Sequence, residues 1–82
     1  MWWLFVQKSE SSKRVIYSYS RNSENLDGIV IYDKRMEEAY IFDPCREDMD
    51  SYKDRNVTLG HFFNYVVDRA FPERKKVSFR NS

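Results

Sequence analysis

The chain begins with a short segment, MWWLFVQK, whose apolar residues strongly constrain the fold. Successive side chains of a β-strand point to opposite faces, so Trp2, Leu4 and Val6 would line one side and Trp3 and Phe5 the other. A strand that is apolar on both faces fits the interior of a sheet better than its edge. The rest of the chain must therefore supply cover for two surfaces.

Length and composition limit the chain to one small domain. The 82 residues are expected to form a single domain, residues 1–82. Cys45 is the only cysteine, so no internal disulfide can form, and a lone thiol suits a reducing cytoplasm. Cys45 and His61 are too few soft ligands for a zinc finger, and we expect neither a metal nor a cofactor.

The apolar start does not have the pattern of a targeting segment. Its apolar run stops at Val6, and Lys8 follows where a secretory leader needs more apolar residues. No run approaches the 18 or so apolar residues of a membrane helix. We therefore expect a cytoplasmic protein that does not bind a membrane.

Five segments have strand patterns. They are residues 2–8, 13–20, 28–33, 39–43 and 75–81. Short polar turns join the first four into two hairpins. The turn between residues 34 and 38 contains no glycine, so we expect a residue of another type to adopt a positive φ there.

Apolar residues recur at helical spacing after Thr58. They are Leu59, Phe62, Phe63, Val66, Val67 and Ala70. Thr58 is expected to cap the start of this helix, and Pro72 ends it because proline lacks an N–H. Residues 44–56 are predicted to be a polar loop with one helical turn after Pro44.

The order β-β-β-β-α-β predicts an α+β fold. Four short-linked strands favour an antiparallel β-meander, and one amphipathic helix returns the chain across one face to the C-terminal strand. Antiparallel pairing of the fifth strand beside the first gives the spatial order 5-1-2-3-4, which we favour. The alternative is parallel pairing beside the fourth strand through a right-handed crossover.

One helix can cover only one face of this sheet. With residues 9–12 as a four-residue turn, Val6 pairs with Val15, and the helix covers Trp2, Leu4 and Val6. The register of the second hairpin stays open, because a slip of one residue exchanges its faces. The face opposite the helix is predicted to bind a partner through Trp3, Phe5, Ile16, Val30, Tyr32, Tyr40 and Phe42.

Charge is unevenly spread along the chain. Residues 37–54 carry a net charge of −5, whereas residues 55–82 carry +4, although the whole chain is at +1. Such asymmetry can orient a partner or a second copy of the chain.

Three functions follow from these patterns. The leading hypothesis is a small non-catalytic protein whose uncovered sheet face mediates self-association, as a homodimer, or protein–protein interaction. The first alternative is single-stranded nucleic-acid binding through the aromatic face, with phosphate contacts from Arg14, Arg74, Lys75, Lys76 and Arg80. The second is a small enzyme or ligand carrier that uses Cys45 and His61 as a thiolate–imidazole pair. Because no third group is marked to orient such a pair, we expect no enzyme.

Overall fold

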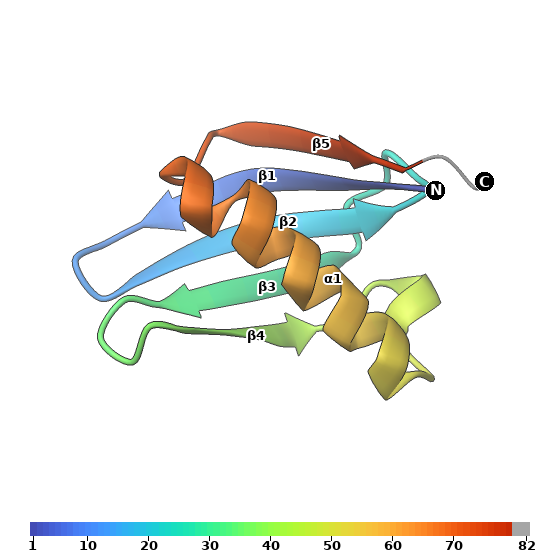
Figure 1. The fold of residues 1–82 in the computed structure, drawn as a ribbon, viewed down its shortest axis with the longest axis horizontal. Coiled ribbons are helices and arrows are strands. Elements are labelled where there is room, and N and C mark those ends of the chain that lie inside the picture. The colour runs from blue at the N-terminus through green and yellow to red at the C-terminus, as the bar shows by residue number, and fades with distance from the viewer. Residues whose placement is uncertain (80–82) are drawn as a thin grey trace.

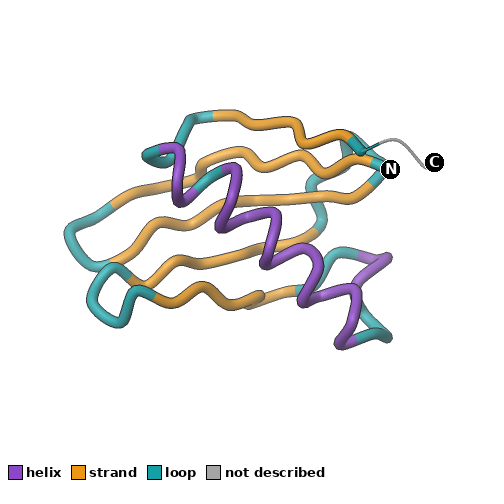
Figure 2. Tube along the Cα trace, in the orientation of Figure 1, coloured by secondary structure: helices purple, strands orange, loops and turns teal. Residues whose placement is uncertain are grey.

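The computed structural model describes residues 1–79 as a five-stranded antiparallel sheet with one long helix on one face (Figure 1). The strands are β1 (Trp2–Glu10), β2 (Arg14–Arg21), β3 (Gly28–Asp33), β4 (Glu38–Asp43) and β5 (Arg74–Ser78). The helix is α1 (Tyr52–Tyr65), and the short 3-10 turns η1 (Arg46–Asp48) and η2 (Val67–Arg69) adjoin its two ends (Figure 2). The strand order β4-β3-β2-β1-β5 confirms the predicted α+β fold and its spatial order.

The helix starts earlier than the sequence pattern indicates. Its N-cap is Ser51, whose hydroxyl accepts a hydrogen bond from the backbone N–H of Asp54 at 3.2 Å. Thr58, the expected cap, instead lies buried inside the helix. The predicted loop 44–56 therefore contains the η1 turn after Pro44 and the first turn of α1.

Backbone conformation confirms the positive φ predicted for the β3–β4 turn, whereas α1 ends at Tyr65 and not at Pro72 as predicted. Glu37 has a φ of 55° in the β3–β4 turn, which is the positive-φ residue expected in the absence of glycine. At the C-terminal end of the helical region, Ala70 and Phe71 have φ values of 60° and 57°, directly before Pro72. This left-handed pair reverses the chain into β5.

The register of β1 against β2 differs from the predicted one. Val6 pairs with Ser18 and not with Val15. Strand β1 extends to Glu10, and Lys8 has no partner because Gln7 pairs with Tyr17 while Ser9 pairs with Ile16. This one-residue bulge shifts every residue before it by one position relative to β2.

The bulge decides which side of β1 meets the helix. If Lys8 were instead paired in a regular ladder, Val6 would lie opposite Tyr19. Trp2, Leu4 and Val6 would then share the face of the β2 tyrosines, as the sequence predicts. With the bulge, Phe5 pairs with Tyr19. The expectation that Trp2, Leu4 and Val6 lie under the helix is therefore wrong, because a single unpaired residue exchanges the two faces.

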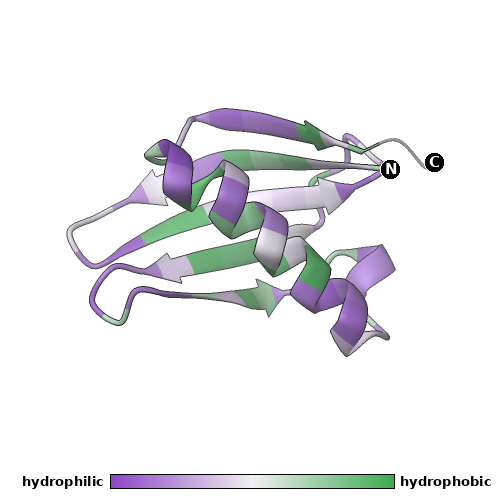
Figure 3. Ribbon diagram, in the orientation of Figure 1, coloured by the Kyte–Doolittle hydropathy of each residue, from purple (hydrophilic) through white to green (hydrophobic). Residues whose placement is uncertain are grey.

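The core lies between α1 and the sheet face that we call the covered face. Its strand residues, all at most 3% exposed, are Trp3, Phe5, Val15, Tyr17, Tyr19, Val30 and Val77. Phe62 of α1 packs against the rings of Phe5 and Tyr17, with ring centroids 5.5 and 5.4 Å away. Figure 3 shows hydrophobic residues in the middle of β1 and β3 and near the start of β2, and mainly hydrophilic residues along β5.

Candidate functional site

The structure divides the seven residues predicted for the partner-binding face between the two sides of the sheet. Four of them lie under the helix, so this prediction is wrong for Trp3, Phe5, Val30 and Tyr32. Three lie on the opposite side, which we call the helix-free face, and there the predicted placement is confirmed for Ile16, Tyr40 and Phe42. The cause is the register of β1 described above and the register that the second hairpin adopts.

Tyr32 shows how the second hairpin is oriented. Tyr32 pairs with Val15 on β2 and with Ala39 on β4, so the three side chains share the covered face. Its ring contacts the rings of Phe63 and Phe71, with centroids 6.0 and 5.3 Å away. These contacts leave the alternate residues Ile29 and Ile31 on the helix-free face.

No helix or strand among residues 1–79 lies on the helix-free face (Figure 1). The apolar side chains on it come from four strands and are Trp2, Leu4, Val6, Ile16, Ile29, Ile31, Tyr40 and Phe42. Neighbouring side chains bury Leu4 and Ile31, whereas Tyr40 is 44% and Phe42 67% exposed. The most exposed part of the face is therefore at its β4 edge.

A second bulge, on β4, presents Phe42 on this face. Ile29 pairs with Asp43 and Val30 with Ile41, so Phe42 is the extra residue. Phe42, Ile16, Ile29 and Ile31 line a shallow hollow of about 400 Å³ whose other walls are the side chains of Lys8, Ser9 and Arg14. The hollow is apolar at its floor and basic at one rim.

Charged residues of opposite sign occupy the two edges of the helix-free face. Arg74 and Lys76 on β5 pair with Val6 and Leu4, and the Lys76 ammonium lies 4.5 Å from the centroid of the Trp2 ring. At the other edge, Asp43 on β4 pairs with Ile29. The face thus has a basic edge and an acidic edge with apolar strands between them.

The five predicted phosphate-contacting cations are distributed in the same uneven way. Arg14, Arg74 and Lys76 lie on the helix-free face. Lys75 pairs with Phe5 and therefore points to the other side, and Arg80 lies outside the described residues. The burial of Trp3, Phe5 and Tyr32 removes three of the aromatic rings that were expected to stack on bases.

A buried polar cluster, which the sequence analysis missed, joins η1 to the sheet and to α1. The carboxylate of Asp48 accepts hydrogen bonds from the hydroxyls of Tyr19 and Thr58, at 2.9 and 2.7 Å, and from the guanidinium of Arg21 at 3.1 Å. The indole N–H of Trp3 donates to the Thr58 hydroxyl at 2.9 Å. Asp48 is fully buried, so these donors replace the water that would otherwise bind its carboxylate.

The same cluster explains the ionisation of Tyr19. The Tyr19 hydroxyl also accepts the backbone N–H of Cys45 at 2.9 Å, and burial raises the pKa of Tyr19 far above its usual value. No spacing in the sequence marks Asp48 among the acidic residues around it, so sequence reasoning had no signal for this carboxylate. We assign the cluster a structural role, because the Asp48 carboxylate and the hydroxyls of Tyr19 and Thr58 are hydrogen-bonded within it.

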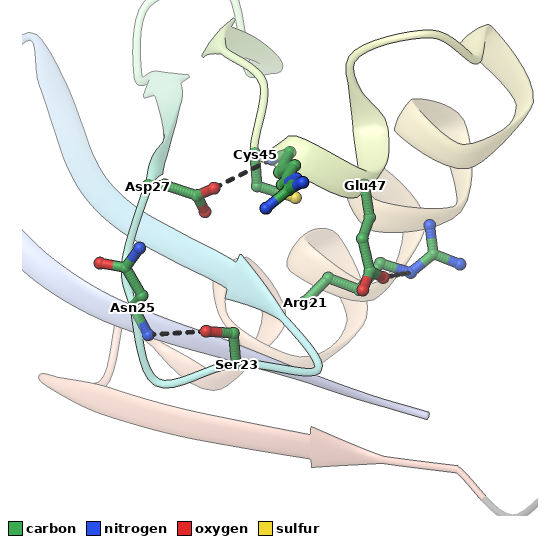
Figure 4. A pocket seen from close by; sticks show the side chains of 7 residues that line it. Arg21, Ser23, Asn25, Asp27, Cys45 and Glu47 are labelled. Atoms are coloured by element: carbon green, nitrogen blue, oxygen red, sulfur yellow. Dashed lines mark hydrogen bonds and ion pairs between the residues drawn. The ribbon is translucent and has the colours of Figure 1, made fainter.

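A polar pocket of about 500 Å³ lies beside this cluster, at the ends of β2 and β4 (Figure 4). Its walls are formed by Arg21, Ser23, Asn25, Asp27, Cys45, Arg46 and Glu47. Asp27 accepts the backbone N–H of Arg46 at 3.1 Å, and Glu47 lies 3.6 Å from the Arg21 guanidinium. Two of the charged side chains of the pocket, Arg21 and Glu47, thus form an ion pair, whereas Asp27 is bound by a backbone N–H.

Cys45 and His61, the pair that would act as nucleophile and base under the enzyme alternative, have different neighbours. Cys45 is buried beside Tyr19, and burial together with the Asp48 charge raises the pKa of its thiol. The His61 ring lies between the rings of Trp3 and Phe79, at 4.3 and 4.5 Å between centroids. Burial and the Arg21 charge lower the pKa of His61. A protonated thiol and a neutral imidazole are the opposite of a reactive pair.

Comparison of the chain with protein-family models, with curated proteins and with solved structures found no match. Within the described part of the chain, no helix is both long and apolar enough to cross a bilayer.

Proposed function

We propose that the protein is a non-catalytic protein-interaction module and that its helix-free face is the docking surface. The observation that carries this proposal is the exposure of Phe42 and Tyr40 beside the isoleucines of the same face. Aromatic residues next to buried aliphatic ones are the usual anchors of protein interfaces. A reducing compartment such as the cytoplasm suits a module whose single thiol is free.

The free energy gained by burying apolar side chains supports the proposal that a partner covers this surface. Full burial of an exposed phenylalanine contributes about 1.5–3 kcal/mol, and Phe42 is the most exposed apolar residue of the face. The basic rim formed by Lys8 and Arg14 next to the apolar hollow adds groups that can fix the orientation of a partner.

Site-specific photo-cross-linking in cells that express the full chain tests this proposal. A benzophenone side chain replaces Phe42 or Tyr40, and the same group at Asn64 or Tyr52 on α1 serves as the control. We expect protein adducts from positions 42 and 40 in clear excess over those from positions 64 and 52. Equal yields at the four positions would overturn the proposal.

The same experiment addresses nucleic acid as the partner. Arg14, Arg74 and Lys76 on the helix-free face are the remaining support for that alternative. Adducts from position 42 that disappear on nuclease treatment would show that the partner is a nucleic acid and not a protein. Nuclease-resistant adducts of discrete mass support the protein partner.

A further inference from the structure

The central row of the helix-free face has a charge pattern that is complementary to itself. The pairings between strands place one residue of each strand in this row: Arg74 of β5, Val6 of β1, Ser18 of β2, Ile29 of β3 and Asp43 of β4. The row begins with a cation and ends with an anion. An apolar side chain lies on each side of the small residue at its middle.

Only one kind of two-fold rotation makes use of this pattern. Two sheets that pack face to face keep their strands roughly aligned, so the symmetry axis lies in the interface, either along the strands or across them. An axis across the strands places β4 over β4 and β5 over β5, which brings like charges together. An axis along the strands reverses the strand order and places β4 of each copy over β5 of the other. It also brings the Arg14 side chains of the two copies together, but these lie exposed at the end of β2, where water screens them.

We propose that the occupant of the helix-free face is a second copy of this chain, related by a two-fold axis that runs parallel to β2 and passes close to Ser18. In this arrangement Arg74 lies over Asp43 of the copy and Val6 over Ile29 of the copy, each contact occurring twice. The two Ser18 side chains meet at the axis. This inference rests on the proposed function and names the partner.

The most exposed aromatic residue of the face fits the same arrangement. Phe42 lies directly before Asp43 on β4, so the rotation brings it close to Arg74 of the copy, whereas Tyr40 lies farther along the strand, level with Ser9 of β1. The aliphatic stem and the guanidinium of Arg74 suit contact with an aromatic ring. The pairing also covers the part of the face that is most exposed in the single chain.

The size of the face sets the expected affinity. Five strands about 4.8 Å apart, each about six residues of 3.3 Å long, give a footprint of roughly 480 Å² for each copy. The roughly 950 Å² that two copies bury together lies just below the ~1,000 Å² of a stable specific interface, so we expect a weak, reversible dimer with a Kd in the high micromolar range.

Charge reversal at the two ends of the row tests the proposal in the full chain. Arg74→Glu places two anions together in a homodimer, and Asp43→Arg places two cations together. Both residues are exposed, so the variants should fold, which urea unfolding at low concentration verifies. By sedimentation equilibrium we expect each variant alone to dimerise at least 10-fold more weakly than the wild type.

An equimolar mixture of the two variants distinguishes the proposed axis from a general weakening of association by the substitutions. Each end of the mixed dimer again joins a cation to an anion, so we expect dimerisation to return to within a few-fold of the wild type. Glu38→Lys reverses an acid on the same strand outside the row and should change the dimer Kd by less than about threefold. A mixture that stays monomeric would overturn the proposed axis.

The outcomes also separate this inference from the proposed function. A wild-type chain that remains monomeric up to about 1 mM overturns the second copy as partner. Photo-cross-linking at position 42 then decides the proposed function separately, because adducts with the mass of a different protein would uphold a docking face with another occupant.

Discussion

The two faces of the sheet carry similar side chains but meet different surroundings. On the covered face, Phe5, Tyr17 and Tyr19 are fully buried against α1. On the helix-free face, Tyr40 and Phe42 are of the same types and are largely exposed. The difference comes from the single helix, which can cover only one side. Composition therefore does not distinguish the core of this protein from its helix-free face, whereas strand register does.

The bulge at Lys8 is the feature that assigns each side of β1 to its face. Because Lys8 has no partner on β2, Trp3 and Phe5 point toward α1 while Leu4 and Val6 point away. Trp3 then reaches Thr58 and becomes part of the polar cluster around Asp48. A local irregularity in one strand thus determines both the core and the surface left open.

Insertion of one alanine after Lys8 would break the comparison at its origin and should have the largest effect. If β1 keeps a single bulge, the added residue places Val6 opposite Tyr19, which turns Trp3 and Phe5 away from the helix and separates Trp3 from Thr58. If the bulge is lost, Phe5 moves two positions along β2 to Arg21. We expect loss of cooperative folding, measured by near-ultraviolet circular dichroism and urea unfolding. The matched control is deletion of Lys8, which removes the unpaired residue, leaves Phe5 opposite Tyr19 and should give a cooperatively folded protein. A folded insertion variant of normal stability would contradict the role given to the bulge.

Truncation of one phenylalanine on each face compares directly how much the two faces contribute to the free energy of unfolding. Phe5→Ala opens a cavity beneath α1 and should lower the free energy of unfolding by about 4 kcal/mol. Phe42→Ala removes a ring that is 67% exposed and should lower it by about 0.5 kcal/mol or less in the monomer. Urea unfolding at low micromolar concentration provides both values, and equal losses would show that the two faces do not differ as described.

Removal of the Asp48 carboxylate tests how the covered face is joined to η1. Asp48→Ala leaves the buried Arg21 guanidinium without its closest anion and the Tyr19 and Thr58 hydroxyls without an acceptor. We expect a loss of about 3 kcal/mol in the free energy of unfolding. The neighbouring Glu47→Gln is the control, because Glu47 is half-exposed and 3.6 Å from Arg21, and it should cost about 0.5 kcal/mol or less.

Acid titration of His61 should give the smallest effect. The folded state lowers the pKa of His61 below its value in the unfolded chain, through burial and the nearby Arg21 charge. The unfolded state therefore binds the proton more readily, and stability falls as the pH drops below about 6.5. Urea unfolding between pH 8 and 5 should show this decrease, and His61→Phe should reduce it. An equal decrease in the variant would exclude His61 as its source.

The fold could be predicted from the sequence because its helix and strands depend on local sequence features. The elements are predicted by the alternation in residues 28–33 and 39–43, by the apolar spacing around Phe62 and by Pro72. The strand order is predicted by the general preference for antiparallel pairing. The start of α1 at Ser51 was missed because residues 52–57 are mostly polar, and the tertiary contacts of Thr58 and Asp48 hold that turn against the sheet.

The sequence could not predict which side chains lie on which face of the sheet, for a different reason. A single unpaired residue at Lys8 reverses the assignment of β1, and no residue type in QKSES marks that position as a bulge. The predicted placement opposite the helix was right only for Ile16, Tyr40 and Phe42, because the bulge moved Trp3 and Phe5 under the helix and the register of the second hairpin placed Val30 and Tyr32 there. The alignment of the acidic and basic edges also depends on this register, because Arg74 pairs with Val6 and Val6 pairs with Ser18 of the central row.

The most direct measurement is chemical cross-linking of a Ser18→Cys variant with a short bismaleimide. A residue on a two-fold axis lies next to its own copy, and the native Cys45 is buried with a raised thiol pKa, so the wild type should not react. We expect a covalent dimer of Ser18→Cys at high micromolar concentration and singly labelled monomer for Asn64→Cys on the outer side of α1. Labelled monomer alone for Ser18→Cys, at every concentration, would contradict the proposed pairing of the two helix-free faces.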